Sequence, residues 1–275
     1  MHGLGNDYIL MIDLANRITS PGQLSKKLSH RHMGIGGDGL ILIRPSQVCD
    51  FKMEMYNADG SEGEMCGNGI RCVGKLIYEQ GLVHQQILWI ETTAGARKLS
   101  LQIEQGTVMR VQVDMGVPEF APLKIPVVAD GDLFLEQPVI VDSMVYSVTC
   151  VSMGNPHAVL FLEEIATLNL PHLGGQIEQN PLFPNRINVE FVQIVTPNQI
   201  HMRVWERGAG ETMACGTGAC AAVVAGVLTG RCARNVSVSL PGGILEVCWE
   251  IDSGHVQMTG PVEIVFEGEA PDDKD

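Results

Sequence analysis

Two cysteine-glycine turns carry the residue types with which this chain could do chemistry. Cys66 lies in the sequence MCGNG and Cys215 in the sequence ACGTG, 149 positions later. A cysteine directly before a helix lies near unpaired backbone N–H groups, which lower the pKa of its thiol and favour the thiolate. Two such thiols on opposite faces of one carbon can remove a proton from one face and deliver a proton to the other, which inverts a stereocentre.

The glycine after each cysteine suits the binding of a small anion. Gly67 and Gly216 have no side chains, so a ligand can approach the backbone N–H groups at the start of the helix. A carboxylate fits this position, because its negative charge grows when a carbanion forms beside it. Either cysteine alone would be explained equally well as a small residue in a tight turn, and the duplication favours the functional interpretation.

The two turns belong to a longer internal repeat. A shift of 149 positions without gaps aligns Gly5-Asn6 with Gly154-Asn155, and Gly81 with Gly230, in addition to the two turns. A constant offset through turns, strands and glycines indicates a duplicated unit, with residues 118–149 joining the copies. Two like halves can face each other across a pseudo-twofold axis, and each then presents one thiol to a shared cleft.

Both halves show the same order of predicted elements. Helices are expected at about 69–80 and 218–229, and the stretch 219–228 is apolar all round, so it should be buried on every side. Strands are expected at 8–12, 40–43, 51–56, 86–91, 97–103, 108–114, 146–151, 158–162, 200–205, 235–240, 244–251 and 256–258. The predicted fold class is α+β, a mixed α/β arrangement of two halves, 1–117 and 118–275, with one main helix in each.

The composition excludes several classes of function. The net charge is −14, with 32 acidic against 18 basic residues, which argues against a nucleic-acid or anionic-membrane partner. The longest apolar run, 219–228, is half of the roughly 20 residues that a membrane helix needs. None of the eight cysteines forms a Cys-x-x-Cys pair, and no secretory signal opens the chain. We therefore expect free thiols in the cytoplasm and no metal site.

No cofactor is expected either. The glycine-rich stretch Gly34–Gly39 does not fit a dinucleotide fingerprint, because the strand-like run Leu40–Ile43 follows it instead of a helix. No lysine stands in a setting typical of pyridoxal phosphate enzymes. The expected ligand is a small-molecule substrate whose proton the two thiols handle by themselves.

Six ordered motifs carry a family resemblance. They are HGLGND at 2–7, NADGS at 57–61, MCGNGIRC at 65–72, MGNPH at 153–157, NRINV at 185–189 and ERGAGET at 206–212, the last continuing through ACGTGAC at 214–220. With these motifs the chain resembles the diaminopimelate epimerases nearly from end to end. The resemblance implies a cofactor-independent isomerase that interconverts LL- and meso-2,6-diaminopimelate by a two-cysteine acid/base mechanism, in lysine and cell-wall precursor biosynthesis.

The resemblance also implies an architecture and an assembly. Each half would be a barrel of strands around a central helix, with the active site in the cleft between the halves. The last strand, at about 261–268, could pack back on the first half. A homodimer fits this class of enzyme.

The roles of individual residues follow from the resemblance. Cys66 and Cys215 match the two acid/base thiols, and His157 and Glu206 match a catalytic pair that orients the substrate or tunes the thiols. The positions that match substrate contacts are Asn6, Asn57, Gly67, Asn68, Asn155, Asn188, Glu206, Arg207, Gly216 and Thr217. Arg207 suits the distal carboxylate of diaminopimelate, because a guanidinium grips a carboxylate with two N–H groups. Taken alone, Asn57 could be a turn residue and His157 a buried, hydrogen-bonded histidine.

The chain departs from the family at two places. Gly39 stands where many members have glutamine, and the repeat places Gly39 opposite Asn188, so one half lacks an amide. A water or a neighbour such as Asp38 could take over its role. The first strand, Met1–Leu4, also looks shorter by about five residues than its counterpart Tyr146–Val151.

Two other functions remain open at this point. One is a related cofactor-independent racemase of the proline or hydroxyproline type, which an assay with LL-diaminopimelate and proline side by side would separate. The other is a non-catalytic protein that uses Cys66 and Cys215 as a redox switch. That protein would exchange no substrate α-hydrogen.

Overall fold

The computed structural model describes residues 1–63 and 66–270. Met65, part of one of the six motifs, lies outside the described residues. Within them the helices are α1 (Pro21–Ser29), α2 (Gly67–Glu79), α3 (Leu170–Glu178) and α4 (Gly216–Leu228). The strands are β1 (His2–Gly3), β2 (Asn6–Ile12), β3 (Gly39–Arg44), β4 (Phe51–Asn57), β5 (Ile87–Thr92), β6 (Gly95–Glu104), β7 (Thr107–Asp114), β8 (Gln137–Val141), β9 (Met144–Ser152), β10 (Pro156–Phe161), β11 (Asn188–Thr196), β12 (Gln199–Glu206), β13 (Gly210–Thr212), β14 (Asn235–Leu240), β15 (Gly243–Trp249) and β16 (Val256–Pro261).

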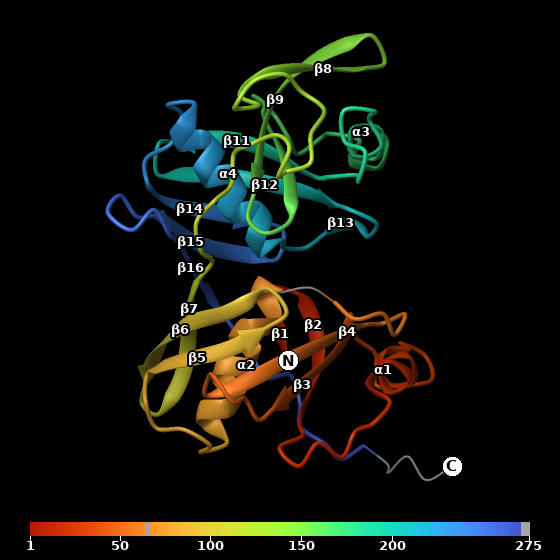
Figure 1. Cartoon of the computed structure of the whole chain (residues 1–275), viewed down its shortest axis with the longest axis vertical. Helices are drawn as coiled ribbons and strands as arrows, with labels where there is room; N and C mark the ends of the chain where they lie inside the picture. The colour runs from red at the N-terminus through yellow and green to blue at the C-terminus, as the bar shows by residue number, and fades with distance from the viewer. Residues whose placement is uncertain (64–65, 271–275) are drawn as a thin grey trace.

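The strands form a mixed sheet in which one pairing pattern occurs twice. Its order is β1-β2-β3-β4-β5-β6-β7-β16-β15-β14-β12-β11-β10-β9-β8, with β13 beside β12. The parallel pairs β2–β3 and β4–β5 of the first half correspond to the parallel pairs β10–β11 and β12–β14 of the second. Figure 1 shows the two halves stacked along the long axis of the molecule, with α2 in one and α4 in the other. The expected mixed fold of two like halves is confirmed.

The antiparallel pair β7–β16 joins the halves at their centre of symmetry. Val111 on β7 pairs with Gly260 on β16, and these two residues are 149 positions apart. The residue pairs on either side of this one exchange places when the same offset is applied. The local twofold axis therefore passes between Val111 and Gly260. This pairing also makes one continuous sheet of what could have been two separate ones.

The two main helices begin at the cysteine turns. Cys66 and Cys215 are the N-cap residues of α2 and α4, in extended backbone conformation, and each sulfur accepts a hydrogen bond from a backbone N–H three residues on. Gly81 and Gly230, just beyond the helix ends, have positive φ angles of 68° and 73°, as a helix C-terminal glycine does. The predicted helices are confirmed with small shifts at their ends.

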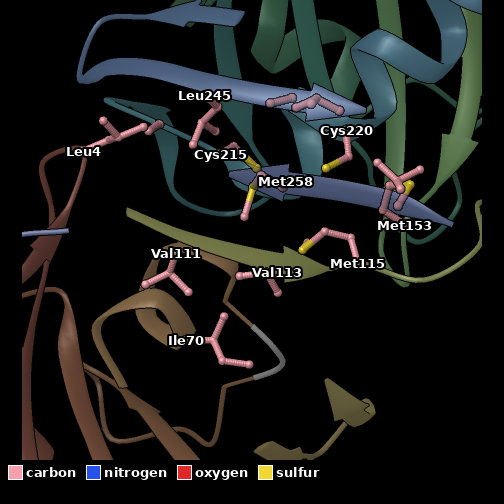
Figure 2. Packing of buried hydrophobic residues seen from close by; sticks show 14 of the residues in the cluster. Leu4, Ile70, Val111, Val113, Met115, Met153, Cys215, Cys220, Leu245 and Met258 are labelled. Carbon is pink, nitrogen blue, oxygen red and sulfur yellow. The ribbon is translucent and has the colours of Figure 1, made fainter. Parts of the chain in front are cut away.

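The central helices hold the core. Residues 216–226 of α4 are all buried, as the apolar sequence predicted. Residues 67–77 of α2 are buried too, although this helix carries Arg71 and Lys75. Figure 2 shows Met258 of β16 beside Cys215, with the side chains of Val113 and Ile70 on the α2 side. One hydrophobic cluster thus runs across both halves, and a second cluster lies within the second half.

The helices α1 and α3 were not predicted, since the sequence pattern indicated one main helix in each half. They span nine residues each and are related by the offset of 149. Both contain proline and glycine, so their intrinsic helix propensity is low. Tertiary contacts stabilise them instead: the buried Ser25 of α1 donates hydrogen bonds to the backbone carbonyls of Tyr56 and Asn57.

The chain near its C-terminus contacts the first half. Beyond β16, Glu263 exchanges two backbone hydrogen bonds with His2. The division of the chain into halves at 1–117 and 118–275 stays a prediction. Among the described residues, no helix is both long and apolar enough to cross a membrane.

Candidate active site

A cavity of about 1040 Å³ lies at the N-terminal ends of α2 and α4. The predicted site residues that line it are Asn6, Asn57, Cys66, Gly67, Asn68, Asn155, Asn188, Glu206, Arg207, Cys215, Gly216 and Thr217. His157 is the one predicted residue that the cavity wall does not include, and its side chain is fully buried. Residues from sequence-distant segments of both halves therefore meet at one place.

The starts of the two helices approach each other closely. A Cβ atom added to Gly67 would lie 3.7 Å from the Cα atom of Gly216, and 3.0 Å from Cε of Met258. A Cβ atom added to Gly216 would lie 2.9 Å from Sδ of Met258. These glycines thus have a structural role in addition to leaving the backbone open to a ligand, because they allow the helix starts to meet.

Each thiol has a distinct set of hydrogen-bond partners. Cys66 Sγ accepts from the Gly69 N–H at 3.4 Å and from the Tyr8 hydroxyl at 3.3 Å, and as a thiol it can donate to Asn6 Oδ1 at 3.5 Å. Cys215 Sγ accepts from the Gly218 N–H at 3.4 Å and lies 3.5 Å from Thr217 Oγ1. The backbone contacts are equivalent in the two halves, whereas the side-chain contacts differ.

Burial raises the pKa of both thiols, contrary to the expectation from the helix N-termini. For Cys66, desolvation raises the pKa, and the hydrogen bonds from Tyr8 and Gly69 oppose it. For Cys215, desolvation raises the pKa well above its usual value, and the nearby carboxylates of Glu206 and Glu190 raise it further. The backbone N–H groups act in the expected direction, but removal from water outweighs them.

Amide side chains frame the two helix starts in an equivalent way. Asn68 Nδ2 donates to Asn6 Oδ1 at 3.3 Å, and Asn155 Nδ2 donates to Thr217 Oγ1 at 3.3 Å. Asn68 also donates to the Ala214 carbonyl at 2.9 Å, which ties the first half to the second beside the cavity. These contacts hold the side chains that surround a ligand at the helix N-termini.

Asn188 uses both ends of its amide to fix the backbone around the site. Its Nδ2 donates to the Pro156 carbonyl at 2.8 Å, and its Oδ1 accepts from the Arg207 N–H at 2.9 Å. Asn188 thereby positions the residue whose guanidinium lines the cavity.

The backbone of Asp38 makes the equivalent bonds in the first half. Its N–H donates to the Asp7 carbonyl at 2.7 Å, and its carbonyl accepts from the Ala58 N–H at 3.1 Å. Asp7 and Ala58 are the repeat partners of the two residues that Asn188 binds. Gly39 needs no amide, and a Cβ atom there would lie 2.3 Å from the Tyr56 carbonyl oxygen. A neighbouring residue thus supplies these two hydrogen bonds.

His157 contacts a carboxylate that the sequence did not single out. Its Nδ1 lies 2.7 Å from Glu190 Oε1, and its Nε2 lies 2.9 Å from Asn155 Oδ1. Glu206, which the resemblance grouped with His157 by role, accepts a hydrogen bond from the Thr212 hydroxyl. The signal for Glu190 was present, because a carboxylate in the apolar strand NVEFV needs a buried partner.

Glu206 lies beside the second thiol. Burial raises the pKa of its carboxyl group, while the hydrogen bonds of Thr212 and Cys215 lower it. Next to it, Arg207 Nη1 donates to the Asn185 carbonyl at 3.4 Å, which leaves further N–H groups of the guanidinium free for an anion in the cavity.

The family model of diaminopimelate epimerase matches residues 1–121 and 149–265. The chain belongs to the diaminopimelate epimerase family. The segment between the two matched stretches coincides with the expected connection between the halves.

Diaminopimelate epimerases of other organisms match this chain over nearly its whole length. The diaminopimelate epimerase of Acetivibrio thermocellus is 51% identical over 269 residues, covering 98% of this chain and 96% of that protein. The diaminopimelate epimerase of Methanococcus maripaludis is 49% identical over 269 residues, with 98% and 97% covered.

Solved structures show the same fold at low sequence identity. A probable proline racemase from Agrobacterium radiobacter K84 has a TM-score of 0.70 and 16% identity, covering all of this chain and 92% of that one. A hydroxyproline epimerase from Agrobacterium vitis has a TM-score of 0.66 and 17% identity, covering 94% and 86%. The epimerase fold therefore extends well beyond the family itself.

Proposed function

We propose that this chain interconverts LL- and meso-2,6-diaminopimelate, with Cys66 and Cys215 as the two acid/base groups. The observation that carries the proposal is the pair of N-cap cysteines on two helices that start at one cavity. Family membership supports the substrate, and the arrangement supports the chemistry. Two thiols from opposite halves suit the removal and delivery of a proton on opposite faces of one carbon.

The reaction begins with one thiol ionised. The Cys66 thiolate takes the α-proton, and the electron pair left on the α-carbon spreads into the substrate carboxylate. Cys215 then gives its S–H proton to the opposite face, so the stereocentre is inverted and no atom is gained or lost. The reverse reaction exchanges the roles of the two sulfurs. The backbone N–H groups at both helix starts stabilise the carboxylate while it carries the extra charge.

The second end of the substrate sets the specificity. Arg207 lines the cavity, and its guanidinium can grip the distal carboxylate with two N–H groups. Asn155 and Asn188 line the same cavity. Besides its bonds within the protein, each amide keeps one N–H and one oxygen lone pair for an amino-acid end. Proline has no second amino-acid end, so the proline-racemase alternative leaves the Arg207 guanidinium without a carboxylate to bind.

His157 is proposed to act through its neighbours. Its ring joins the buried Glu190 to Asn155, which lines the cavity, so it can fix the orientation of the Asn155 amide. Glu206 is proposed to contact the substrate and to hold the Cys215 thiol.

A deuterium experiment tests the proposal. With LL-diaminopimelate in deuterium oxide under reducing conditions, the product epimer should gain deuterium before the recovered substrate does. One base that swings between both faces would label the two pools at similar early rates and would rule out the two-thiol mechanism. Proline serves as the control substrate and should exchange no α-hydrogen. Exchange with proline alone would favour the racemase alternative.

Single cysteine replacements locate the two bases. Cys66→Ala and Cys215→Ala should each abolish net epimerisation, because each face of the carbon needs its own thiol. Cys49→Ala, a cysteine outside the cavity, should leave the rate unchanged. Epimerisation that survives either of the first two changes would remove that thiol from the reaction.

We also propose a cytoplasmic location, as part of lysine and cell-wall precursor biosynthesis. All eight cysteines are free, which suits a reducing compartment. The homodimer expected for this class stays a prediction, and light scattering on the purified protein measures it.

A further inference from the structure

Tyr8 on β2 contacts the Cys66 sulfur from within the cavity wall. Its hydroxyl donates to Cys66 Sγ at 3.3 Å, and its side chain is 6% exposed. Burial raises the pKa of this phenol well above its usual value, and the nearby Cys66 and Asp38 add to the effect. The hydroxyl therefore stays protonated at neutral pH and can act only as a neutral donor toward a thiolate.

The repeat places Tyr8 opposite His157. Tyr8 pairs with Gly39 in the sheet and His157 pairs with Asn188, so the two residues have the same register in their halves. The His157 ring, however, bonds to Glu190 and not to the second thiol. Equivalent positions thus carry different chemistry, a hydroxyl donor beside Cys66 and a histidine–carboxylate pair in the other half.

The charged groups around the two sulfurs also disfavour a thiolate more strongly at Cys215 than at Cys66. Cys215 lies near two carboxylates, Glu206 on β12 and Glu190 on β11, which disfavour a second negative charge. Cys66 has Tyr8 and the Gly69 N–H as donors and a single carboxylate, Glu206, among the groups that raise its pKa. Asn6 Oδ1, at 3.5 Å, is an acceptor for the thiol form, and the two donors oppose it.

A buried cation lies behind the Cys66 turn. Arg71 is fully buried, with Nη1 donating to the Gly67 carbonyl at 3.0 Å and Nε to the Pro261 carbonyl at 3.3 Å. Its charge interacts with the thiols of Cys72, Cys66 and Cys220 and with the guanidinium of Arg110. This buried positive charge also favours an anion at the start of α2.

We propose that Tyr8 holds Cys66 as the thiolate of the resting pair and leaves the proton on Cys215. The inference rests on the proposed function, in which these two thiols handle the substrate proton. Cys66 is then ready to accept the α-proton and Cys215 to donate its own. After one turnover the two sulfurs have exchanged their protonation states, and the hydrogen bond from Tyr8 favours return to the resting arrangement.

Cysteine alkylation in the substrate-free protein tests the assignment. Iodoacetamide reacts with thiolates, so peptide mass spectrometry across neutral and alkaline pH gives a midpoint for each cysteine. In the unmodified protein, Cys66 should be alkylated at lower pH than Cys215. Tyr8→Phe, which removes only the hydroxyl, should raise the Cys66 midpoint by about one pH unit, the typical effect of one hydrogen bond to a charged group. The Cys215 midpoint should stay unchanged.

Tyr78→Phe is the matched control, because Tyr78 lies near the far end of α2 and packs against the same core. It should shift neither midpoint. A Cys215 that reacts at lower pH than Cys66 in the unmodified protein would overturn the proposal, even if the Tyr8 variant did not fold. So would an unchanged Cys66 midpoint, or equal shifts at both cysteines, in a folded Tyr8→Phe.

The kinetic consequence has its own readout. In Tyr8→Phe, the acid limb of the pH profile of kcat/KM should move up by about one pH unit. At pH values below this limb kcat/KM should fall about tenfold, and at pH values above it kcat/KM should change little. A loss that is equal at every pH would indicate a merely structural role and contradict the proposal. Alkylation uses no substrate, so a failure of this proposal can be distinguished from a failure of the epimerase assay.

Discussion

Cys66 and Cys215 occupy equivalent positions but have unlike neighbours. Both cap a helix, and both accept one backbone N–H at 3.4 Å. Only Cys66 accepts a hydrogen bond from a tyrosine, and only Cys215 has burial and two carboxylates raising the pKa of its thiol together. At the scale of single residues, the duplicated site has thus become asymmetric, which suits two sulfurs that must start a reaction in different protonation states.

Arg207 is the residue on which we expect substrate choice to depend most. Arg207→Lys keeps the positive charge but loses the two-pronged geometry, so it should lose about 2 kcal/mol or more of transition-state binding. The measurement is kcat/KM for LL-diaminopimelate, compared with Arg203→Lys, whose guanidinium binds Glu211 and backbone carbonyls. An unchanged kcat/KM in Arg207→Lys would remove this residue from the substrate site.

At the scale of elements, the approach of α2 to α4 decides where the site lies. Each helix starts at a glycine because a side chain there would meet Met258 or the other helix. The short helices α1 and α3 show the opposite case, in which packing on the sheet stabilises a sequence of low helix propensity.

Gly216→Ala tests the approach of the helices. The new Cβ atom would lie 2.9 Å from Sδ of Met258, so we expect a loss of about 1–3 kcal/mol of stability together with reduced activity. Gly175→Ala in α3 is the control, since its Cβ atom would meet only Trp205, at an ordinary 3.7 Å. Denaturant unfolding at neutral pH measures both. Equal effects of the two substitutions would mean that the helix starts have room to separate.

The cysteines inside the two central helices predict a loss of stability at alkaline pH. Burial raises the pKa of Cys72 and of Cys220 to about 12. A raised folded-state pKa means that the stabilising contribution is complete below the ordinary thiol pKa and is lost as pH rises toward the folded value. At about pH 10, each thiol should already cost about 1–2 kcal/mol of the free energy of unfolding.

A double variant isolates this effect. Cys72→Ala with Cys220→Ala should lose about 3 kcal/mol less between neutral pH and about pH 10 than the unmodified chain does under reducing conditions. Urea unfolding at both pH values gives the difference. If both proteins lose the same free energy of unfolding, the pKa values of these two thiols are not raised in the folded state.

At the scale of the whole molecule, the pseudo-twofold axis brings the two cysteine turns together. The axis passes between Val111 and Gly260, and the helix starts meet beside it. Neither half contains a complete site, because each supplies one thiol and one set of amide side chains. Sheet continuity through β7 and β16 holds the halves in register while the cavity stays open between them.

Mild oxidation should link the two turns in the empty enzyme. Gly67 and Gly216, the residues that follow the cysteines, are close enough that a Cβ atom on one would lie 3.7 Å from the Cα atom of the other. A disulfide needs Cα atoms within about 7 Å, so little movement is required. We expect oxidant to inactivate the free enzyme, a dithiol reductant to restore it, and bound substrate to protect it.

Peptide mapping identifies the linked residues. Cys66 should be joined to Cys215, with the other six cysteines free. Inactivation that instead follows Cys72 or Cys220, or inactive protein in which both cavity thiols stay free, would contradict the facing arrangement of the turns.

The sequence alone determined the repeat and the two central helices, and it supplied the residues that we propose to be reactive. These features are encoded locally: a cysteine before a glycine-rich helix start, a glycine at the helix end and apolar periodicity between them. Because the repeat has a constant offset, the elements predicted in one half also predicted the positions of the equivalent elements in the other. The motifs then located most of the residues that line the cavity, but not Tyr8, Arg31 or Asp38.

Tertiary structure alone decided the state of those residues. The expected lowering of the thiol pKa was wrong in direction, because desolvation depends on how the whole chain packs around each sulfur. Hydrogen-bond partners such as Tyr8 for Cys66 and Glu190 for His157 come from other strands, and only the sheet register brings them together. Local patterns specify which groups can react, and long-range packing sets the solvent exposure and partners that determine how they react.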